Sequence, residues 1–282
     1  MKPLKISVTI ICVFLFSASF SQTIGPEKGK LIIVGGGDTE KITPYFIEQA
    51  GGENAKIVVI PTASEEETFN DDWYFLKELK SAGAKNVTIV HTRDPKEADT
   101  KEFVKPITEA TGVWFTGGRQ WRLVDAYAGT KVVDELWKLL ERGGIIGGSS
   151  AGATIQGSYL ARGDSKTNTI MMGDHQEGFG FLKDVAIDQH VLARNRMFDM
   201  FEIIEAHTEL LGLGIDESTA LVVSNDTMKV IGKSYVAVYD GTLYKRDTRE
   251  LQTLPDHSQK FFFLREGDQY DLMERKIIIP ER

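Results

Sequence analysis

The strongest constraint on the fold is an alternation of short apolar runs with helical segments along the first half of the chain. The apolar runs are rich in β-branched residues, and most of them end at glycine or proline, as buried strands do. They lie at residues 29–34, 56–60, 87–91, 112–116 and 144–147. Residues 71–82 and 131–142 carry apolar side chains at helical spacing. Strands that alternate with helices form right-handed βαβ units. We therefore predict an α/β fold, with a mainly parallel central sheet sandwiched by helices.

The pattern changes after about residue 219. Four short strand candidates follow there, separated by turns, at residues 220–223, 228–231, 235–239 and 260–264. They predict an antiparallel β addition over about 220–282. A linker rich in Pro, Gly or Ser is absent from the sequence, so residues 22–282 are predicted to form a single domain.

The first 21 residues are typical of a secretory signal peptide. Lys2 and Lys5 precede a mostly apolar run at 6–16, and small residues lead to a cleavage point near Ser21. The alternative is a membrane anchor, but the run is short for a bilayer. We therefore expect a secreted or periplasmic protein with no membrane contact in its mature form. Cleavage would also remove Cys12, the one cysteine.

Composition excludes several classes of function. The chain has a formal net charge of −8 and no block of lysine and arginine, so it is a poor candidate for binding nucleic acid. Two glycine-rich stretches imitate nucleotide-binding loops. The stretch 35–37 has Glu40 where a dinucleotide fingerprint needs glycine, and the stretch 232–234 has Thr227 where a phosphate loop needs one. We interpret the first as a strand-exit turn and discard the second.

A serine nucleophile is indicated by the sequence Gly148-Ser149-Ser150-Ala151-Gly152. It has a G-x-S-x-G core, follows a predicted strand and precedes a predicted helix. That setting exposes the Ser150 hydroxyl at a sharp turn, at the carboxyl end of the sheet. The N–H of Ala151 would then point to where an oxyanion forms. The alternative is a Gly/Ser-rich turn that binds nothing.

A serine nucleophile needs a base, and His190 is the candidate. It ends the sequence Asp188-Gln189-His190, directly after the apolar run 185–187. If that run is a strand of the same sheet, its end could place His190 beside Ser150. Arg194 and Arg196 follow at short intervals, and guanidinium groups bind carboxylates well.

Four motifs in order make the chain resemble the S51 serine peptidases, a family that contains cyanophycinases and aspartyl dipeptidases. The motifs are FTGGRQWR at 115–122, GGSSAGA at 147–153, DQH at 188–190 with the two arginines, and GIDE at 214–217. The resemblance runs from about residue 30 to 231. The DQH element with its arginines and the GIDE element are similar to the cyanophycinase branch.

The resemblance implies a class I glutamine amidotransferase-like fold, no metal or cofactor, and a possible homodimer. It implies that Ser150 is the nucleophile, His190 the general base, and the N–H groups of Ala151 and the Gly117-Gly118 turn the oxyanion hole. It also implies a set of substrate-pocket residues, namely Gln120, Asp188, Gln189, Arg194 and Arg196.

Two positions depart from the family pattern. The third triad member is expected to be an acid at about 165–168, and that window holds none. Asp164 is the nearest candidate, although it could equally be a turn residue, and Glu177 is more distant. Asp199 stands where cyanophycinases tend to carry a further arginine. It could attract a substrate guanidinium or mark a different substrate.

These residues lead to one main hypothesis and two alternatives. The main hypothesis is an exported serine exopeptidase that cleaves cyanophycin, a polymer of aspartate carrying β-linked arginine, to β-Asp-Arg dipeptides through an acyl-enzyme on Ser150. The first alternative is an isoaspartyl or aspartyl dipeptidase, so the expected partner is cyanophycin or a β-aspartyl peptide. The second is a catalytically silent protein that binds acidic peptides.

Overall fold

The computed structural model describes residues 23–241 and 261–279. The expected signal peptide at residues 1–21 lies outside this part of the chain, as do residues 242–260 and 280–282 of the expected β addition. None of the helices in the described ranges is long and apolar enough to cross a membrane.

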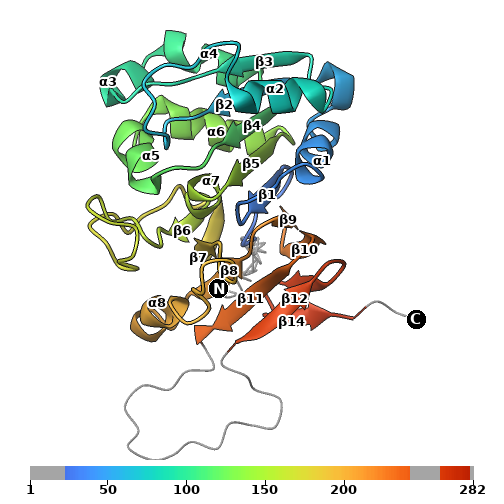
Figure 1. Ribbon diagram of the computed structural model, residues 1–282, viewed down its shortest axis with the longest axis vertical. Coiled ribbons are helices and arrows are strands. Elements are labelled where there is room, and N and C mark those ends of the chain that lie inside the picture. Colours follow the sequence, from blue (N-terminus) through green and yellow to red (C-terminus); the bar gives the residue numbers. More distant parts are fainter. Residues whose placement is uncertain (1–22, 242–260, 280–282) are drawn as a thin grey trace, which may run out of the picture.

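Five parallel strands form one side of the larger sheet, from β1 (Lys30–Val34) to the edge strand β3 (Asn86–Ile89) (Figure 1). The others are β2 (Lys56–Ile60), β4 (Gly112–Phe115) and β5 (Ile145–Ser149). Their spatial order is β1-β5-β4-β2-β3, and each neighbouring pair is parallel. The mixed α/β architecture predicted from the alternation is confirmed.

Helices cover both faces of these strands because successive side chains of a strand point to opposite faces. Leu31 and Ile33 of β1 share a core with side chains from four helices on one face. These helices are α3 (Pro95–Ala98), α4 (Lys101–Glu109), α5 (Gln120–Tyr127) and α6 (Lys131–Glu141). Ile32 and Val34 pack on the other face with α1 (Ile42–Gln49) and α2 (Tyr74–Ser81). A short 3₁₀ helix, Gly52–Asn54, follows α1. A strand that is buried on both faces must be apolar throughout, which explains the continuous runs in the sequence.

A second sheet shares the first of these cores. Its order is β12-β11-β8-β7-β6, formed by β6 (Gly157–Tyr159), β7 (Leu182–Gln189), β8 (Leu211–Ile215), β11 (Tyr235–Asp240) and β12 (Phe262–Arg265). Val185 and Ile187 of β7 contribute to the shared core, while α8 (Met200–Ala206) packs with the opposite face of this sheet. The expectation that the strand before His190 belongs to the central sheet is therefore wrong. Its apolar side chains are buried by packing one sheet against the other.

The strands after residue 219 are divided between the two sheets. Strands β9 (Thr219–Ser224), β10 (Thr227–Gly232), β13 (Gln269–Asp271) and β14 (Lys276–Ile278) continue the larger sheet beyond β1, with antiparallel pairing. Strands β11 and β12 pair antiparallel in the smaller sheet. The chain crosses between the sheets at residues 216–218. Because Val34 is paired with Ala220, this crossing lies at the carboxyl end of β1 (Figure 1).

Candidate active site

Ser150 occupies a sharp turn between β5 and helix α7 (Ala151–Thr154). Its backbone has φ 56° and ψ −112°, a conformation that non-glycine residues rarely adopt. The Ser150 N–H donates to Val34 O at 3.0 Å. The glycines on either side have no room for a side chain, because a Cβ on Gly148 would lie 2.2 Å from Gly152 O and one on Gly152 would lie 2.3 Å from Phe115 O. The G-x-S-x-G pattern is thus a packing requirement of this turn.

His190 connects the serine to a carboxylate. Its Nε2 lies 2.9 Å from Ser150 Oγ, and its Nδ1 lies 2.6 Å from Glu217 Oε1. A carboxylate oxygen can only accept, so Nδ1 carries the proton that it donates to Glu217. Nε2 is then free to accept the proton of the serine hydroxyl. This arrangement has the geometry that acyl transfer requires of a nucleophile, a base and an orienting acid.

The structure places Glu217, and not Asp164, beside the base. Asp164 Oδ1 accepts from the backbone N–H of Lys166 at 3.0 Å and of Thr167 at 2.5 Å, so Asp164 closes its own turn. The expectation that Asp164 is the third member of the triad is therefore wrong. An aspartate carboxylate satisfies nearby backbone N–H groups readily, which makes it the turn residue that the sequence also allowed.

The sequence did contain a signal for Glu217. It ends the GIDE motif, and the crossing at 216–218 carries it from the end of β8 to the carboxyl end of β1. A search at a fixed number of residues after Ser150 misses Glu217, because the contact of Glu217 with His190 depends on how the two sheets pack. Glu177, the more distant candidate, instead pairs through its backbone with Tyr159 of the edge strand β6, in an isolated antiparallel β-bridge.

The stretch 35–37 lies directly against the base and its acid. A Cβ on Gly36, where φ is +114°, would lie 2.1 Å from His190 Cε1. A Cβ on Gly37, where φ is +71°, would lie 2.7 Å from Glu217 Cβ. Gly35 O accepts from the His190 N–H at 3.0 Å. The turn was correctly interpreted as a strand exit, but its role as the wall behind the imidazole was missed.

The environment of His190 favours its neutral form. Burial lowers the pKa of the imidazole below its ordinary value of 6.5, and the charges of Arg194 and Arg196 lower it further. The hydrogen bond to Glu217 and its charge act in the opposite direction without cancelling the shift. A neutral imidazole at pH 7 is the form that can accept the serine proton.

The residues of the predicted oxyanion hole lie at the serine turn or next to it. Ala151 is the first residue of α7, where backbone N–H groups have no partner within the helix. Gly117 borders the serine, since a Cβ built on it would lie 3.4 Å from Ser150 Cβ. Gly118 packs tightly on the 63–64 backbone, where its own Cβ would lie 2.0 Å from Ala63 O. The oxyanion role of Gly118 and Ala151 stays a prediction.

A cavity of about 260 Å³ opens at Ser150 and His190. Of the five predicted substrate-binding residues, only Arg194 lines it. Its lining also includes the aromatic side chains of Tyr74, Phe75 and Trp114 and the carboxylate of Glu78. A polar nucleophile beside aromatic side chains and one guanidinium group suits a substrate with a carboxylate near the reacting bond.

The other four predicted substrate-binding residues have partners inside the protein. Gln120 Nε2 donates to Ala161 O and Arg162 O, each at 2.8 Å. Gln189 Oε1 accepts from Arg196 at 2.9 Å. In this structure these side chains shape the site from behind rather than line the cavity.

Asp188 belongs to a buried ion network that sequence reasoning missed. Arg162 donates two hydrogen bonds to the Asp188 carboxylate, at 2.8 and 2.9 Å, and a third to Asp199. The side chains of Arg162 and Asp188 are only 2% and 1% exposed. Asp199, where a further arginine was expected, is therefore a partner of Arg162. A lone arginine after a short strand gave no signal for this.

Within residues 23–241 and 261–279, no group of three or more His, Cys, Asp and Glu side chains is placed to hold a metal ion.

Comparison with known proteins gives consistent results. The model of peptidase family S51 matches residues 30–231. The cyanophycinase of Geminocystis herdmanii is 30% identical over 256 residues, which cover 86% of this chain and 94% of that protein. The cyanophycinase of Synechococcus elongatus is 31% identical over 272 residues, covering 90% and 84% of the two chains.

Solved structures share the fold at lower identity. A peptidase from an acI-B1 Actinobacterium superimposes with a TM-score of 0.64 at 23% identity, over 88% of this chain and 98% of that one. A putative peptidase E protein from Listeria monocytogenes gives a TM-score of 0.52 at 17% identity, over 73% and 99%.

Proposed function

The chain belongs to peptidase family S51 and is a serine-type hydrolase, and we propose that it is an exported peptidase that degrades cyanophycin to β-Asp-Arg dipeptides. The observation that carries this proposal is the hydrogen-bonded set Ser150, His190 and Glu217 at a cavity that Arg194 lines. Relatives named cyanophycinase, at about 30% identity over most of their length, support this choice of substrate.

The proposed reaction follows from the hydrogen bonds. Ser150 Oγ bonds to the carbonyl carbon of the scissile peptide bond while its proton passes to His190 Nε2. That proton then passes to the leaving nitrogen, the carbon–nitrogen bond breaks, and an acyl-enzyme remains. A water molecule gives its proton to the same imidazole and hydrolyses the ester. Glu217 keeps Nδ1 protonated and stabilises the imidazolium, while Ala151 and the Gly117-Gly118 turn would bind the oxyanion.

Recognition would come from the charged side chains around the base. In cyanophycin the α-carboxyl of each backbone aspartate is in the peptide bond to be cut and its β-carboxyl holds the arginine, so the free carboxylate near the reacting bond is that of the arginine. Arg194 is positioned at the cavity to bind such a carboxylate, and Arg196 lies behind it on Gln189. Asp188 and Asp199 would act indirectly, because Arg162 holds both of them.

Three further points belong to the same proposal. Export is supported by the signal-like residues 1–21, and N-terminal sequencing of protein recovered from the cell exterior would locate the cleavage point. The glutamine amidotransferase-like class is supported by a nucleophile at a strand-to-helix turn of a parallel sheet. A homodimer is supported by the resemblance alone, and sedimentation equilibrium would measure the mass in solution.

The test uses insoluble cyanophycin and, in parallel, a panel of soluble isoaspartyl dipeptides. We expect the purified protein to release β-Asp-Arg, identified by mass, and the Ser150→Ala variant to release none above background. Cleavage of the dipeptides without release from the polymer would contradict the proposal and indicate a dipeptidase. Full activity of Ser150→Ala would contradict the serine mechanism.

A further inference from the structure

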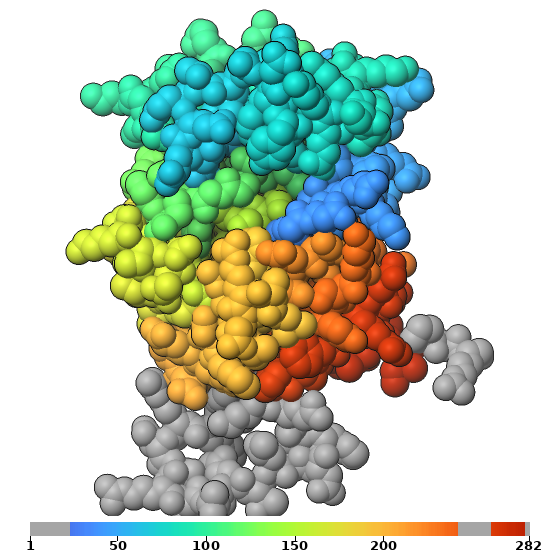
Figure 2. Space-filling model, viewed as in Figure 1, coloured from blue at the N-terminus to red at the C-terminus, as the bar shows by residue number. Residues whose placement is uncertain are grey.

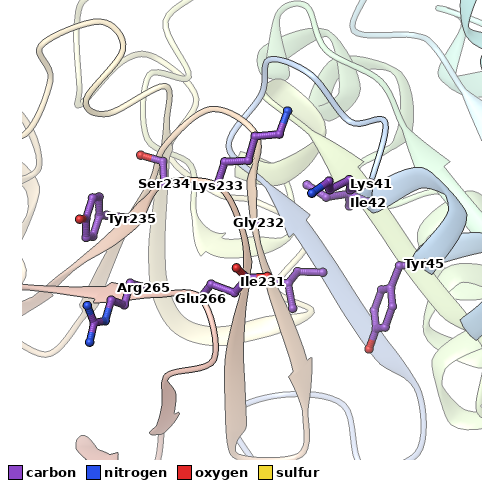
Figure 3. Close-up of a pocket in the computed structure, with 10 residues that line it drawn as sticks. All are labelled: Lys41, Ile42, Tyr45, Ile231, Gly232, Lys233, Ser234, Tyr235, Arg265 and Glu266. Atoms are coloured by element: carbon purple, nitrogen blue, oxygen red, sulfur yellow. The ribbon is translucent and has the colours of Figure 1, made fainter.

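A second cavity, of about 780 Å³, lies outside the site described above (Figure 3). It is bounded by the start of α1 on one side and by the turns after β10 and β12 on the other. In Figure 3, Ile231 lies near the middle of the cavity, with Lys41, Ile42 and Tyr45 on one side and Tyr235 and Arg265 on the other. We name this cavity the basic groove and define it by Lys41, Lys233, Arg265, Tyr45, Tyr235 and Glu266.

The basic groove adjoins the catalytic cavity through one short loop. Gly36, Gly37 and Thr39, in the loop between β1 and α1, line the catalytic cavity. Lys41, at the end of the same loop, lines the basic groove. Asp38, between them, accepts a hydrogen bond from Lys233 at 2.8 Å across the loop. A long substrate bound at Ser150 therefore needs to cross only this loop to reach the groove.

Hydrogen bonds through Asp216 connect the wall of the basic groove to the loop that follows His190. Ser234, in the turn after β10, donates to Asp216 Oδ2 at 2.6 Å. The other oxygen of the buried Asp216 carboxylate accepts from the backbone N–H of Leu192 at 3.0 Å and of Ala193 at 2.8 Å, just after His190. The groove and the base thus have a fixed geometry relative to each other.

The charges of the basic groove contrast with those of the chain. The protein has a net charge of −8, yet three cations gather here beside one acid, Glu266. Lys233 is paired with Asp38, whereas Lys41 and Arg265 form no ion pair with any residue in the described ranges. Two cations that form no salt bridge within the described part of the chain are available to carboxylates of a ligand.

The groove also presents an exposed aromatic face. Tyr235 is 47% exposed and lies opposite Arg265 in the pairing of β11 with β12. Its ring contacts that of the exposed Phe263 edge to face, with centroids 6.1 Å apart. Exposed aromatic faces attract guanidinium groups, and Glu266 adds a carboxylate for the same purpose.

We propose that the basic groove binds a stretch of the polymeric substrate beyond the residue that is being cut. This inference rests on the proposed function. Each repeat of cyanophycin carries a free carboxylate and a guanidinium, and the groove offers cations for the one and aromatic rings with an acid for the other. The catalytic cavity, a third of the volume of the groove, then selects the terminal unit, while the groove keeps the enzyme on the polymer.

The experiment compares the double variant Lys41→Glu/Arg265→Glu with the double variant Lys101→Glu/Lys105→Glu. Both make the same change in net charge, and Lys101 and Lys105 are exposed on α4, away from both cavities. Each pair is also placed in the Ser150→Ala protein, and binding to insoluble cyanophycin is measured by sedimentation. Turnover of the polymer is compared with turnover of a soluble three-unit fragment.

We expect the groove variant to bind the polymer about fivefold more weakly than the control variant, from the loss of two exposed charge contacts. The ratio of polymer turnover to fragment turnover should fall by about the same factor. Equal binding and an equal ratio in the two double variants would overturn the groove assignment and leave the proposed function intact. Failure of the unaltered protein to cleave polymer or fragment would overturn the proposed function and the groove with it.

Discussion

Single residues of the site adopt backbone conformations that few side chains tolerate. Ser150 and His190 both have φ 56°, and each is held by a hydrogen bond to the segment that ends β1, at Val34 O and Gly35 O. The strain positions the nucleophile and the base so that they point at each other. The segment after β1 is therefore as much a part of the site as the serine turn.

Glu217 is expected to matter far more for catalysis than Asp164. Glu217→Gln keeps the size of the side chain but removes the charge that orients and stabilises the imidazole. By analogy with amide substitutions in serine triads, kcat should fall by roughly 10³ to 10⁴. Asp164→Asn should change kcat less than about twofold, because an amide oxygen can accept the same two backbone hydrogen bonds. Steady-state kinetics distinguishes the two, and a larger effect at Asp164 would contradict the geometry.

The pH profile should report the lowered pKa of His190. Activity requires neutral imidazole, so kcat/KM should fall as the pH drops through a value below 6.5. Arg194 and Arg196 help to lower this pKa, so Arg194→Gln should move the acid limb of the profile to higher pH. Lys101→Gln, far from the site, is the control. An acid limb that stays in place in Arg194→Gln would show that this charge does not act on His190.

Gly36 is expected to tolerate no side chain. In Gly36→Ala the new methyl group would collide with the imidazole, and the backbone would also be strained at φ +114°. Displacing the base from the serine should reduce kcat by about 10² or more. Gly52→Ala also replaces a glycine with positive φ, +61°, but its methyl group meets no atom within 4 Å. That control should lose about 1 kcal/mol of stability and keep its kcat. Equal kcat in the two variants would contradict the tight contact.

At the level of elements, one buried ion network joins three segments. Arg162 follows β6, Asp188 is the last but one residue of β7, and Asp199 precedes α8. Their hydrogen bonds therefore fix the second sheet and the loop that carries His190 and Arg194. Because Asp188 sits two residues before the base, a shift of this network would misplace the imidazole.

Removal of Arg162 should therefore destabilise the fold strongly. Arg162→Met leaves the buried Asp188 carboxylate without its cation, at a cost of about 3 to 5 kcal/mol in the free energy of unfolding. Adding Asp188→Leu should recover part of that loss, because neither buried charge then remains unpaired. Urea denaturation of the two variants measures the difference. A double variant less stable than Arg162→Met would show that the unpaired Asp188 carboxylate is not the cause of the lost stability.

For the molecule as a whole, the sequence patterns predicted the features that depend on residues close in the chain, namely single strands and turns. The apolar runs gave β1, β2, β4 and β5, and the flanking glycines gave the serine turn, because both depend on neighbours in sequence. The patterns could not tell which sheet β7 joins, since a buried strand looks the same in either. The identity of the orienting acid was lost for the same reason, as Glu217 reaches His190 only through the packing of the two sheets.

The substrate residues show the same limit. Asp188, Gln120 and Gln189 have the polarity that a binding site needs, but polarity does not reveal whether the partner is a ligand or the protein. Arg162, 26 residues before Asp188, is the partner that removes Asp188 from the cavity. The partner of a side chain cannot be predicted from neighbouring residues when that partner is distant in the sequence.

The most direct measurement is a search for the acyl-enzyme. The protein is mixed with the soluble fragment, quenched in acid within milliseconds, cleaved with trypsin and analysed by mass. Lysine and arginine are absent between Arg142 and Arg162, so the peptide 143–162 carries Ser150. We expect this peptide to gain the mass of the acyl group of the substrate, and the Ser150→Ala peptide to gain nothing. Turnover with an unmodified peptide 143–162 throughout, or with the acyl group on another peptide, would contradict the role of Ser150.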